Sequence, residues 1–349
     1  AYLGTKPRNL TILKNCHVKR ILIYKDQAIG IETVEGNKIY AEEEVILCQG
    51  AFGTPQTLLL SGIGPESQLK NLNIPVYVNA PGVGENLADH VDVSMQYGST
   101  RKDLSLARFQ RLDKAIYLMT RWLLLKSGPG SGAFFSTVIF HAFEDTSFPE
   151  LQIYMTPMII DENLTDQTND TTPLFERLGK TIFSRGRKVA KPGIQIDINQ
   201  MRPKSFGSIR LKSKNPLDHP LIDLNYYENK CDLKELLEGV KVMREVMSKS
   251  EISKYHSGEL PPFHNAKSDS EIQEAIYKNT YSGHHPCSTA RMGPETDQLA
   301  VLDSNLKVRG INKLRVCDAS AFPTQITGNL NATVIAFAEK AAEMILEGD

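Results

Sequence analysis

The first fifty residues alternate between short apolar runs and turn-forming residues, a pattern typical of β-strands. Gly30, Gly36 and Asn37 supply turn chemistry between the runs. The expected strands cover residues 11–24, 27–34, 37–41 and 43–50. The pattern therefore predicts a β-meander followed by one more buried strand. A short helix with a proline near its first turn is expected over residues 56–61.

From about residue 91 the pattern becomes mixed, with helical periodicity in some stretches and strand-like runs in others. Strands are expected at 194–201, 207–211 and 313–316, and helices at 104–125, 232–247 and 331–346. The helix at 104–125 carries interleaved Arg and Lys, which favours an amphipathic surface helix over one that lies in a membrane. The order strand, loop, helix at the end of the chain predicts a cofactor site in the loop 318–328.

Composition places the chain among ordinary globular proteins. Of its 349 residues, 41% are hydrophobic and 23% charged, and the formal net charge is -1, so neither disorder nor a nucleic-acid partner is indicated. The longest strongly apolar stretch, 122–125, is far too short to span a bilayer. Five cysteines without CxxC spacing argue against a disulfide framework and a structural zinc site, and favour a reducing compartment such as the cytoplasm.

Four separated strings carry the most specific signal. They are EVILCQGAFGTPQTLLLSGIGP at 44–65, PGVGENLADH at 81–90, GHHPCSTARMG at 283–293 and the stretch 314–345. Together, and in this order, they resemble the glucose-methanol-choline (GMC) oxidoreductases. The resemblance implies a mixed α/β chain that contains the remainder of a doubly wound FAD-binding domain and a substrate domain with an antiparallel sheet and helices. Residues 1–92 and 286–349 would form the first domain, and 93–285 the second.

The family's N-terminal strand, GxGxxG turn and helix have no counterpart in these residues. The glycine clusters at 62–64, 82–84 and 128–132 do not follow a strand and open a helix, as a dinucleotide site requires. A nicotinamide cofactor is therefore not indicated. The chain also begins Ala-Tyr-Leu without an initiator Met, so we expect a cut chain, with the missing unit supplied by a preceding segment or a separate chain.

Flavin-dependent alcohol oxidation needs a base within hydrogen-bond reach of the substrate hydroxyl, and imidazole suits this role because its unperturbed pKa is about 6.5. The resemblance assigns the base to His285, with His284 as its rival and as a neighbour of the cofactor. The alternative is a histidine that is only hydrogen-bonded in a buried turn. Ser288 stands where the family usually has Gly, so a positive φ there would strain the loop.

The second catalytic position of the family falls on Asn329, whose amide can hydrogen-bond the substrate oxygen without competing for the proton. The alternative for Asn329 is a helix N-cap, since a helix follows directly. Both roles are compatible, because the amides of Leu330 and later residues could stabilise negative charge on the reduced flavin.

The resemblance places three further residues beside the cofactor. Asp318 and Ala319 match positions near the pyrophosphate and ribityl chain, and a buried capping Asp is the alternative for the former. Val18 matches a position whose backbone meets the adenine, although a strand Val is usually a core residue.

An acidic residue follows the Asp89-His90 pair of the second string. In the choline-oxidising branch of the family, this position, here Asp92, faces the substrate's trimethylammonium group. A carboxylate attracts a cation through Coulomb pairing, whereas a solvated surface Asp is the alternative. Cys287 lies next to the expected base and is interpreted as a packed thiol, not a nucleophile.

The sequence thus predicts an FAD-dependent alcohol oxidoreductase without a metal, acting on a small-molecule alcohol, with dioxygen or a quinone as electron acceptor. Two alternatives stay open. One is a hydroxynitrile lyase on the same scaffold, in which flavin is bound but carries out no redox chemistry. The other is an inactive fragment that requires a separate N-terminal chain.

Overall fold

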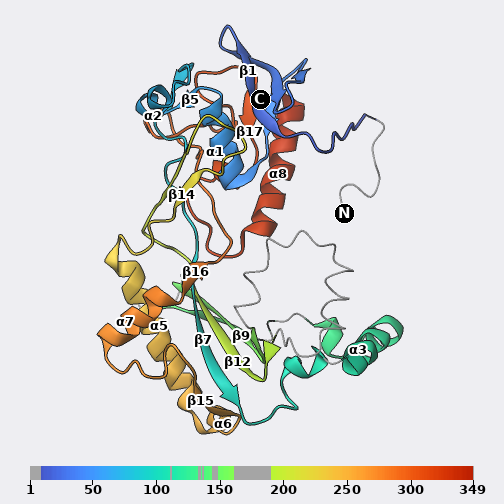
Figure 1. Ribbon diagram of the computed structural model, residues 1–349, viewed down its shortest axis with the longest axis vertical. Coiled ribbons are helices and arrows are strands. Elements are labelled where there is room, and N and C mark those ends of the chain that lie inside the picture. The colour runs from blue at the N-terminus through green and yellow to red at the C-terminus, as the bar shows by residue number, and fades with distance from the viewer. Residues whose placement is uncertain are drawn as a thin grey trace. The chain divides into compact units, whose positions relative to one another are not determined.

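The computed structural model describes residues 9–110, 112–132, 135, 137–143, 148–160 and 190–348 (Figure 1). The chain divides into two compact units. The first contains residues 1–89, 205–225 and 285–349, and the second contains 90–204 and 226–284. These boundaries lie close to the expected ones at 92 and 285. The segment 205–225, however, was expected in the substrate domain and belongs to the first unit.

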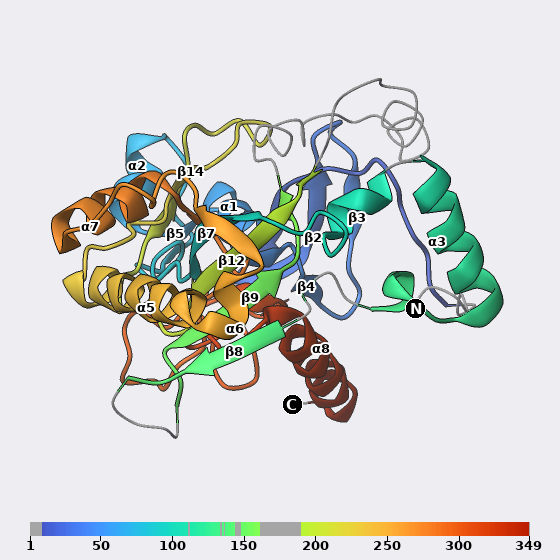
Figure 2. The same cartoon turned by 90° about the horizontal axis from the view of Figure 1, so that it is seen from below.

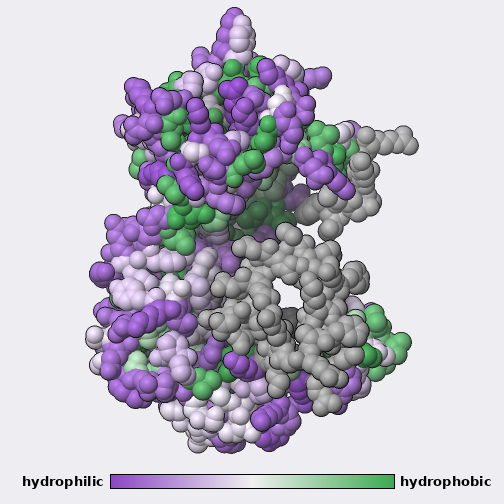
Figure 3. Space-filling view, in the orientation of Figure 1, coloured by the Kyte–Doolittle hydropathy of each residue, from purple (hydrophilic) through white to green (hydrophobic). Residues whose placement is uncertain are grey.

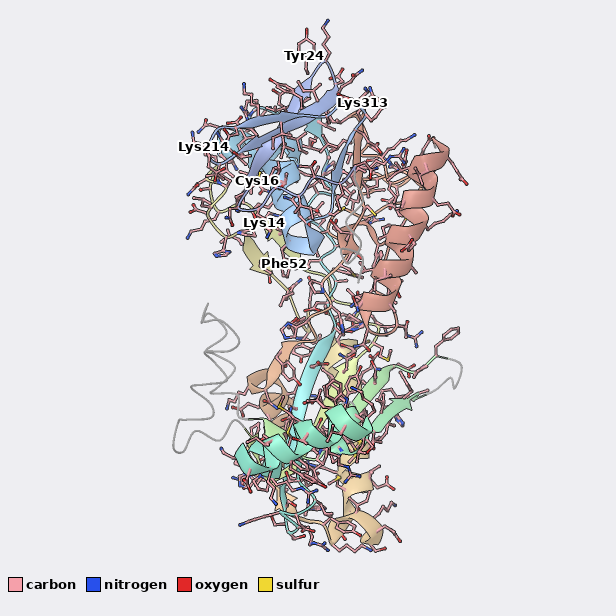
Figure 4. The ribbon with its side chains drawn as sticks, turned by 90° about the vertical axis from the view of Figure 1, so that its right-hand side faces the viewer. Lys14, Cys16, Tyr24, Phe52, Lys214 and Lys313 are labelled. Carbon is pink, nitrogen blue, oxygen red and sulfur yellow. The ribbon has the colours of Figure 1, made fainter. Side chains whose placement is uncertain are left out.

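The predicted β-meander forms the outer part of the first unit. Strands β1 (Val18–Tyr24), β2 (Gln27–Thr33) and β3 (Lys38–Tyr40) pair antiparallel in that order. Lys25 and Asp26 both have positive φ, which is the signature of the type I′ turn that suits a two-residue hairpin. Tyr24 projects from this hairpin tip (Figure 4). The first strand begins at Val18 instead of residue 11, since Asn15, with a φ of 54°, interrupts the extended chain.

Two parallel strands lie beneath the meander: β4 (Val45–Leu47) pairs with β17 (Leu314–Val316). Helix α1 (Gly50–Leu60) follows the first strand, and helix α8 (Leu330–Glu347) closes the chain. Smaller elements complete the unit: β5 (Ile63–Gly64), α2 (Glu66–Asn71), β6 (Val78–Asn79), β13 (Ser208–Arg210), β14 (Leu221–Asp223) and the 3₁₀ turn η4 (Ala319–Ala321).

Helix α1 begins six residues earlier than predicted and contains Pro55 in its interior. A proline has no N–H, so the carbonyl of Ala51, four residues before it, loses its helical donor. That carbonyl instead accepts the hydroxyl of Thr289 at 2.6 Å. The defect in the helix thereby becomes an anchor for the loop that carries the expected catalytic histidine.

Backbone hydrogen bonds explain why 205–225 joins the first unit. Leu87 and Gly207 exchange both of their backbone hydrogen bonds, at 3.1 and 2.8 Å, and Ile209 N donates to Gly84 O. Gly84 has a φ of 83°, and a Cβ built there would lie 2.3 Å from Ile209 O, so only glycine fits. This contact depends on close backbone approach, which hydrophobic patterning does not reveal.

The second unit contains a six-stranded sheet in which all the pairings are antiparallel. Its strands are β15 (His256–Glu259), β7 (Val91–Ser99), β12 (Gly193–Gln200), β9 (Leu151–Thr156), β8 (Thr137–His141) and β16 (Thr280–Ser282), which pairs with β7. A two-stranded pair, β10 (Ile159–Ile160) and β11 (Ala190–Lys191), extends it.

Three helices lie beside this sheet: α5 (Lys230–Ser248), α6 (Ser250–Ser253) and α7 (Asp269–Lys278) (Figure 2). Alternate residues of β7 and β12, such as Val93, Met95 and Ile196, pack against apolar side chains of α5 and α7. The other alternate residues of the same strands are polar. The sheet therefore has one apolar face, covered by helices, and one polar face.

Helix α3 (Leu112–Leu125) is preceded by η1 (Leu106–Gln110) and followed by η2 (Pro129–Ser131). Its apolar side chains remain exposed, including Met119 and Leu124, and they form an apolar patch (Figure 3). Within the part of the chain that the structure describes, no helix has the length and apolar character needed to cross a membrane.

Candidate active site

The loop that carries His285 is held on both sides of its backbone. His285 N donates to Asp89 Oδ1 at 2.9 Å, and His285 O accepts from Gln325 Nε2 at 3.2 Å. Asp89 is buried, whereas the histidine itself is half-buried. This arrangement fixes the main chain of His285 and leaves part of the imidazole accessible.

The residues after His285 run between two other segments of the first unit. Cys287 and Ala88 exchange backbone hydrogen bonds at 2.9 and 3.2 Å, and Thr289 O accepts from Gly84 N at 2.8 Å. On the other side, Ser288 N donates to Ala319 O at 3.1 Å. Two of the four recognised strings, 81–90 and 283–293, are therefore neighbours in space, and the loop after β17 completes the group.

Ser288 adopts the positive φ that the family's glycine suggested, with a value of 69°. The residue is fully buried, and its hydroxyl donates to Cys287 Sγ at 3.3 Å. A serine in the left-handed region costs about 1 kcal/mol relative to glycine. The surrounding hydrogen bonds hold it there, so the loop keeps its path despite the substitution.

Asn329 is the N-cap residue of α8 by position, but its side chain makes no capping hydrogen bond. Its Nδ2 lies instead 3.3 Å from Nε2 of His285. An amide nitrogen can only donate, so this contact is a hydrogen bond when Nε2 of His285 is the unprotonated ring nitrogen. The two residues that the sequence selected as a catalytic pair are thus in contact, 44 positions apart in the chain.

An apolar cluster supports both members of this pair. Ala88, Cys287, Phe322 and Leu330 are buried against one another, so the residue after Asn329 packs with a residue close to His285. Burial raises the pKa of the Cys287 thiol to about 12. A thiol with so high a pKa is neutral at physiological pH, which agrees with a packed residue and not a nucleophile.

The carboxylate of Asp318 is committed to protein donors. Oδ2 accepts from Gly50 N at 3.0 Å and Thr54 Oγ1 at 2.6 Å, while Oδ1 accepts from the amide and hydroxyl of Ser320 at 2.8 and 2.5 Å. This buried side chain ties the start of α1 to the turn η4. The geometry is that of the capping alternative.

The other residues predicted to contact the cofactor lie on different elements of the structure. Val18 is the first residue of β1 and is half-buried, Leu330 opens α8, and Ala319 opens η4, where its carbonyl accepts from Ser288. His284 is exposed and belongs to the second unit, with its backbone N bonded to Ser282 Oγ at 2.9 Å. The structure thus places His284 and His285 in different units.

Asp92 lies on the polar face of the sheet in the second unit. Its register partners are Asn199 on β12, whose Nδ2 donates to Asp92 Oδ1, and Tyr281 on β16. The Tyr281 hydroxyl donates to Asp197 Oδ1 at 2.9 Å, so this ring reaches across from β16 to the second carboxylate. An acidic and aromatic surface therefore forms around Asp92. Sequence reasoning missed Tyr281 and Asp197, although the polar half of the β12 alternation contained the signal.

Among the described residues, three buried polar atoms on this face have no hydrogen-bond partner: Ser94 Oγ, Thr156 Oγ1 and Asn199 Oδ1. Ser94 lies opposite Asp197, and Thr156 opposite Gln195, so the three come from neighbouring strands. Buried polar atoms are normally paired, and leaving one unpaired costs roughly 1–3 kcal/mol. Such a group of unpaired atoms is typical of a surface that receives a polar ligand.

Two family models match the chain, and both describe GMC oxidoreductases. The N-terminal model covers residues 3–92 and the C-terminal model covers 203–338. The matched ranges contain Asp89, His285 and Asn329, the residues that meet in the first unit.

Relatives agree with these models. An oxygen-dependent choline dehydrogenase of Photobacterium profundum is 34% identical over 99% of this chain and 58% of its own length. The human mitochondrial choline dehydrogenase is also 34% identical, over 94% of this chain and 52% of its own. The formate oxidase of Aspergillus oryzae, an FAD protein, has a TM-score of 0.77 at 26% identity, covering 95% of this chain and 59% of the solved chain.

The chain thus spans little more than half the length of the curated relatives it matches. Both matched models describe GMC oxidoreductases, and the C-terminal model covers both His285 and Asn329, which are in contact. This chain belongs to the GMC oxidoreductase family.

Proposed function

We propose that the complete protein is an FAD-dependent oxidoreductase that converts an alcohol to an aldehyde or ketone, and that His285 and Asn329 act on the substrate hydroxyl. The observation that carries this proposal is the 3.3 Å contact between Asn329 Nδ2 and His285 Nε2. Nε2 of His285 and the amide Nδ2 of Asn329 are adjacent, so one alcohol oxygen placed beside them could contact both.

In this role, Nε2 of His285 takes the proton of the hydroxyl, and Asn329 Nδ2 donates to the oxygen as negative charge develops on it. The clamp from Asp89 and Gln325 on the His285 backbone keeps the ring in place for the transfer. FAD bound to the complete protein would supply the acceptor for the hydride of the alcohol carbon.

Several residues of the first unit fit a flavin cofactor. Asn86 Nδ2, three residues before Asp89, is a buried donor that has no partner among the residues the structure describes. The first turn of α8 contains no acidic residue, and its leading amides have no helical acceptor, so this helix start favours an anionic group. Because the oxygens of Asp318 already accept from Gly50, Thr54 and Ser320, the backbone of its loop, not the carboxylate, would hold the cofactor.

We also propose that residues outside these 349 complete the cofactor domain and supply the grip on the adenine half. Parallel strands are normally covered on both faces, yet Ile46 in β4 is 41% exposed between two buried neighbours. On α8, only Leu330 and Ala341 are buried, and Ile335 is 41% exposed. Phe52, on α1, is also exposed (Figure 4). These apolar surfaces fit contact with a further strand and helix.

A cationic alcohol is the substrate class that Asp92 favours. Asp92 and Asp197 supply negative charge on one sheet face, and the Tyr281 ring lies on the same face. Carboxylates and aromatic faces both attract a quaternary ammonium group.

The experiment is anaerobic mixing of the complete flavoprotein with candidate alcohols, both cationic and neutral. Bleaching of the oxidised flavin absorption with formation of a carbonyl product is expected. His285→Ala should retain flavin but bleach roughly 10² or more times slower, while His264→Ala, at an exposed histidine, serves as the matched control and should be unaffected.

Product formation without bleaching would assign the scaffold to a lyase. Unchanged bleaching by His285→Ala would contradict the proposed base. Admitting dioxygen or a quinone afterwards, and timing the return of the oxidised spectrum, identifies the electron acceptor.

A further inference from the structure

A group of neighbouring side chains, the polar quartet, lies on the polar face of the sheet in the second unit. Its members are Asp92 and Ser94 on β7 and Asp197 and Asn199 on β12. Asp92 is the register partner of Asn199, and Ser94 is the partner of Asp197. Directly opposite side chains have Cβ atoms about 4.5–5.5 Å apart, and diagonal ones about 7–8 Å. The two carboxylates occupy one diagonal and are close enough to contact one small ligand.

The amide of Asn199 is oriented by its neighbour. Its Nδ2 donates to Asp92 Oδ1, and a carboxylate can only accept, so the amide oxygen faces away from Asp92. This oxygen is buried and has no hydrogen-bond partner among the described residues, and Asn199 as a whole is only 2% exposed. Because buried carbonyl oxygens are normally paired, this position calls for a donor, which a ligand would supply.

The carboxylate of Asp197 is held in one orientation by neutral groups. Gln195 Nε2 donates to Oδ1 at 2.9 Å and to Oδ2 at 3.2 Å, and the Tyr281 hydroxyl donates to Oδ1 at 2.9 Å. These donors carry no charge, so they fix the carboxylate without neutralising it. Each carboxylate oxygen has two acceptor sites, so Oδ2 can accept a further donor.

The strands around the quartet supply acceptors but no positive charge. The sequences of β7, β9, β12 and β16 contain neither Lys nor Arg. The hydroxyls of Ser94 and Thr156, both buried and unbonded within the described segments, can accept as well as donate. A buried charge is favourable only when it is paired. The surface therefore fits a ligand that has both a positive charge and hydrogen-bond donors.

We propose that the polar quartet binds a protonated amino group that retains at least one N–H, so that the substrate is a primary, secondary or tertiary amino alcohol in its ammonium form. The inference rests on the proposed function and narrows its cationic substrate class. An N–H of the ammonium group donates to Asn199 Oδ1, and the charge is balanced by Asp92 and Asp197.

The unpaired oxygen of Asn199 separates this class from quaternary ammonium alcohols. Coulomb attraction to the carboxylates and contact with the Tyr281 ring act on both kinds of cation. A quaternary group has the same charge but no N–H, so it leaves the buried oxygen of Asn199 without a donor. Sites built around a hydrogen bond reject a ligand that lacks it far more strongly than apolar pockets reject an extra methyl group.

The test is calorimetric titration of the complete flavoprotein at neutral pH with four cations that lack a hydroxyl: propylamine and its N-methyl, N,N-dimethyl and N,N,N-trimethyl derivatives. The dissociation constant is expected to change by less than about threefold while an N–H is present, and to rise roughly tenfold or more at the last methylation. That step removes the final N–H without changing the charge. Equal or tighter binding of the trimethyl cation, or no binding of any of the four, would overturn the proposal.

Two variants assign the selectivity to Asn199. Asn199→Leu removes the unpaired oxygen and should reduce the difference between the dimethyl and trimethyl cations to less than about twofold. Gln152→Leu removes a buried amide at the register partner of Asn199 on β9 and is the matched control, which should keep the full difference. An undiminished difference in Asn199→Leu would contradict the assignment. Circular dichroism verifies folding, and the wild-type titration stays decisive if a variant does not fold.

Anaerobic flavin reduction by the matching alcohols, ethanolamine and its three N-methylated derivatives, separates this inference from the proposed function. A kcat/KM at least roughly tenfold higher for an alcohol with an N–H than for the trimethyl alcohol supports both. Equal or faster reduction by the trimethyl alcohol overturns the inference and leaves the oxidoreductase intact. Selective binding of the N–H cations without flavin reduction by any alcohol supports the ligand class and contradicts the proposed function.

Discussion

The loop around His285 and the polar face of the sheet in the second unit contain similar residue types but use them differently. Around His285, Thr289, Asp318 and Gln325 all bond to other parts of the protein. On the sheet face, the hydroxyls of Ser94 and Thr156 are buried and have no partner within the part of the chain that the structure describes. The first region is preorganised by its own hydrogen bonds, as reacting groups require. The second region has buried polar atoms that are unbonded among the described residues, as expected of a surface that binds a polar ligand.

The largest expected effect on stability comes from a substitution in the preorganised region around His285. Asp318→Asn replaces two acceptor oxygens by one oxygen and one amide, so an NH₂ group must face donors from Gly50 and Thr54 or from Ser320. We expect the free energy of unfolding to fall by roughly 3 kcal/mol. Urea denaturation followed by circular dichroism measures it. Asp223→Asn, at an exposed carboxylate of the same unit, is the control and should change little.

Thr289→Val should have the next largest effect. The substitution conserves shape but leaves the carbonyl of Ala51 without a donor, since Pro55 cannot supply one. A loss of roughly 2 kcal/mol in unfolding free energy is expected. Thr289→Ser keeps the hydroxyl and should restore most of it. Equal losses for Val and Ser would show that the methyl packing, not the hydrogen bond, matters.

Asp92→Asn tests whether the sheet face recognises charge. The asparagine keeps an acceptor for Asn199 Nδ2 but removes the negative charge. For a cationic alcohol, kcat/KM should fall by roughly tenfold or more, while a neutral alcohol of similar size should be unaffected. Equal losses for both substrates would assign Asp92 a structural role. If the wild type oxidises no cationic alcohol, the choline-like substrate class is excluded.

The smallest expected effect comes from Thr156→Val, the same substitution as at residue 289 and at an equally buried site. Here the hydroxyl has no partner in the described segments, so its removal should change the unfolding free energy by less than about 0.5 kcal/mol, or increase it. KM should rise if the hydroxyl contacts substrate. A loss as large as that of Thr289→Val would remove the distinction between the two regions.

Periodicity and turn chemistry predicted much of the fold. The meander, the buried strand after it and the helices near 232–247 and 331–346 agree with β1 to β4, α5 and α8. The start of α1 and the placement of 205–225 were not predictable in this way. Both depend on hydrogen bonds between distant parts of the chain, which local sequence patterns do not reveal. Thr289 bonds the carbonyl of Ala51 in α1, and Leu87 bonds Gly207.

The candidate site was predictable only where residues match a family string. His285, Asn329 and Asp318 were singled out in this way, but their roles remain predictions. What the sequence could not show is the clamp from Asp89 and Gln325, because these residues come from segments 196 and 40 positions away from His285.

The central claim is that His285 and Asn329 act together on one substrate oxygen. A double-mutant cycle on the rate of anaerobic flavin reduction, with His285→Gln, Asn329→Ala and the combined variant, tests it directly by stopped-flow absorbance. The account predicts that His285→Gln slows reduction by roughly 10² or more, and that adding Asn329→Ala then costs much less than it does alone. Independent, multiplicative losses, or a His285→Gln enzyme that reduces its flavin at the wild-type rate, would contradict the account.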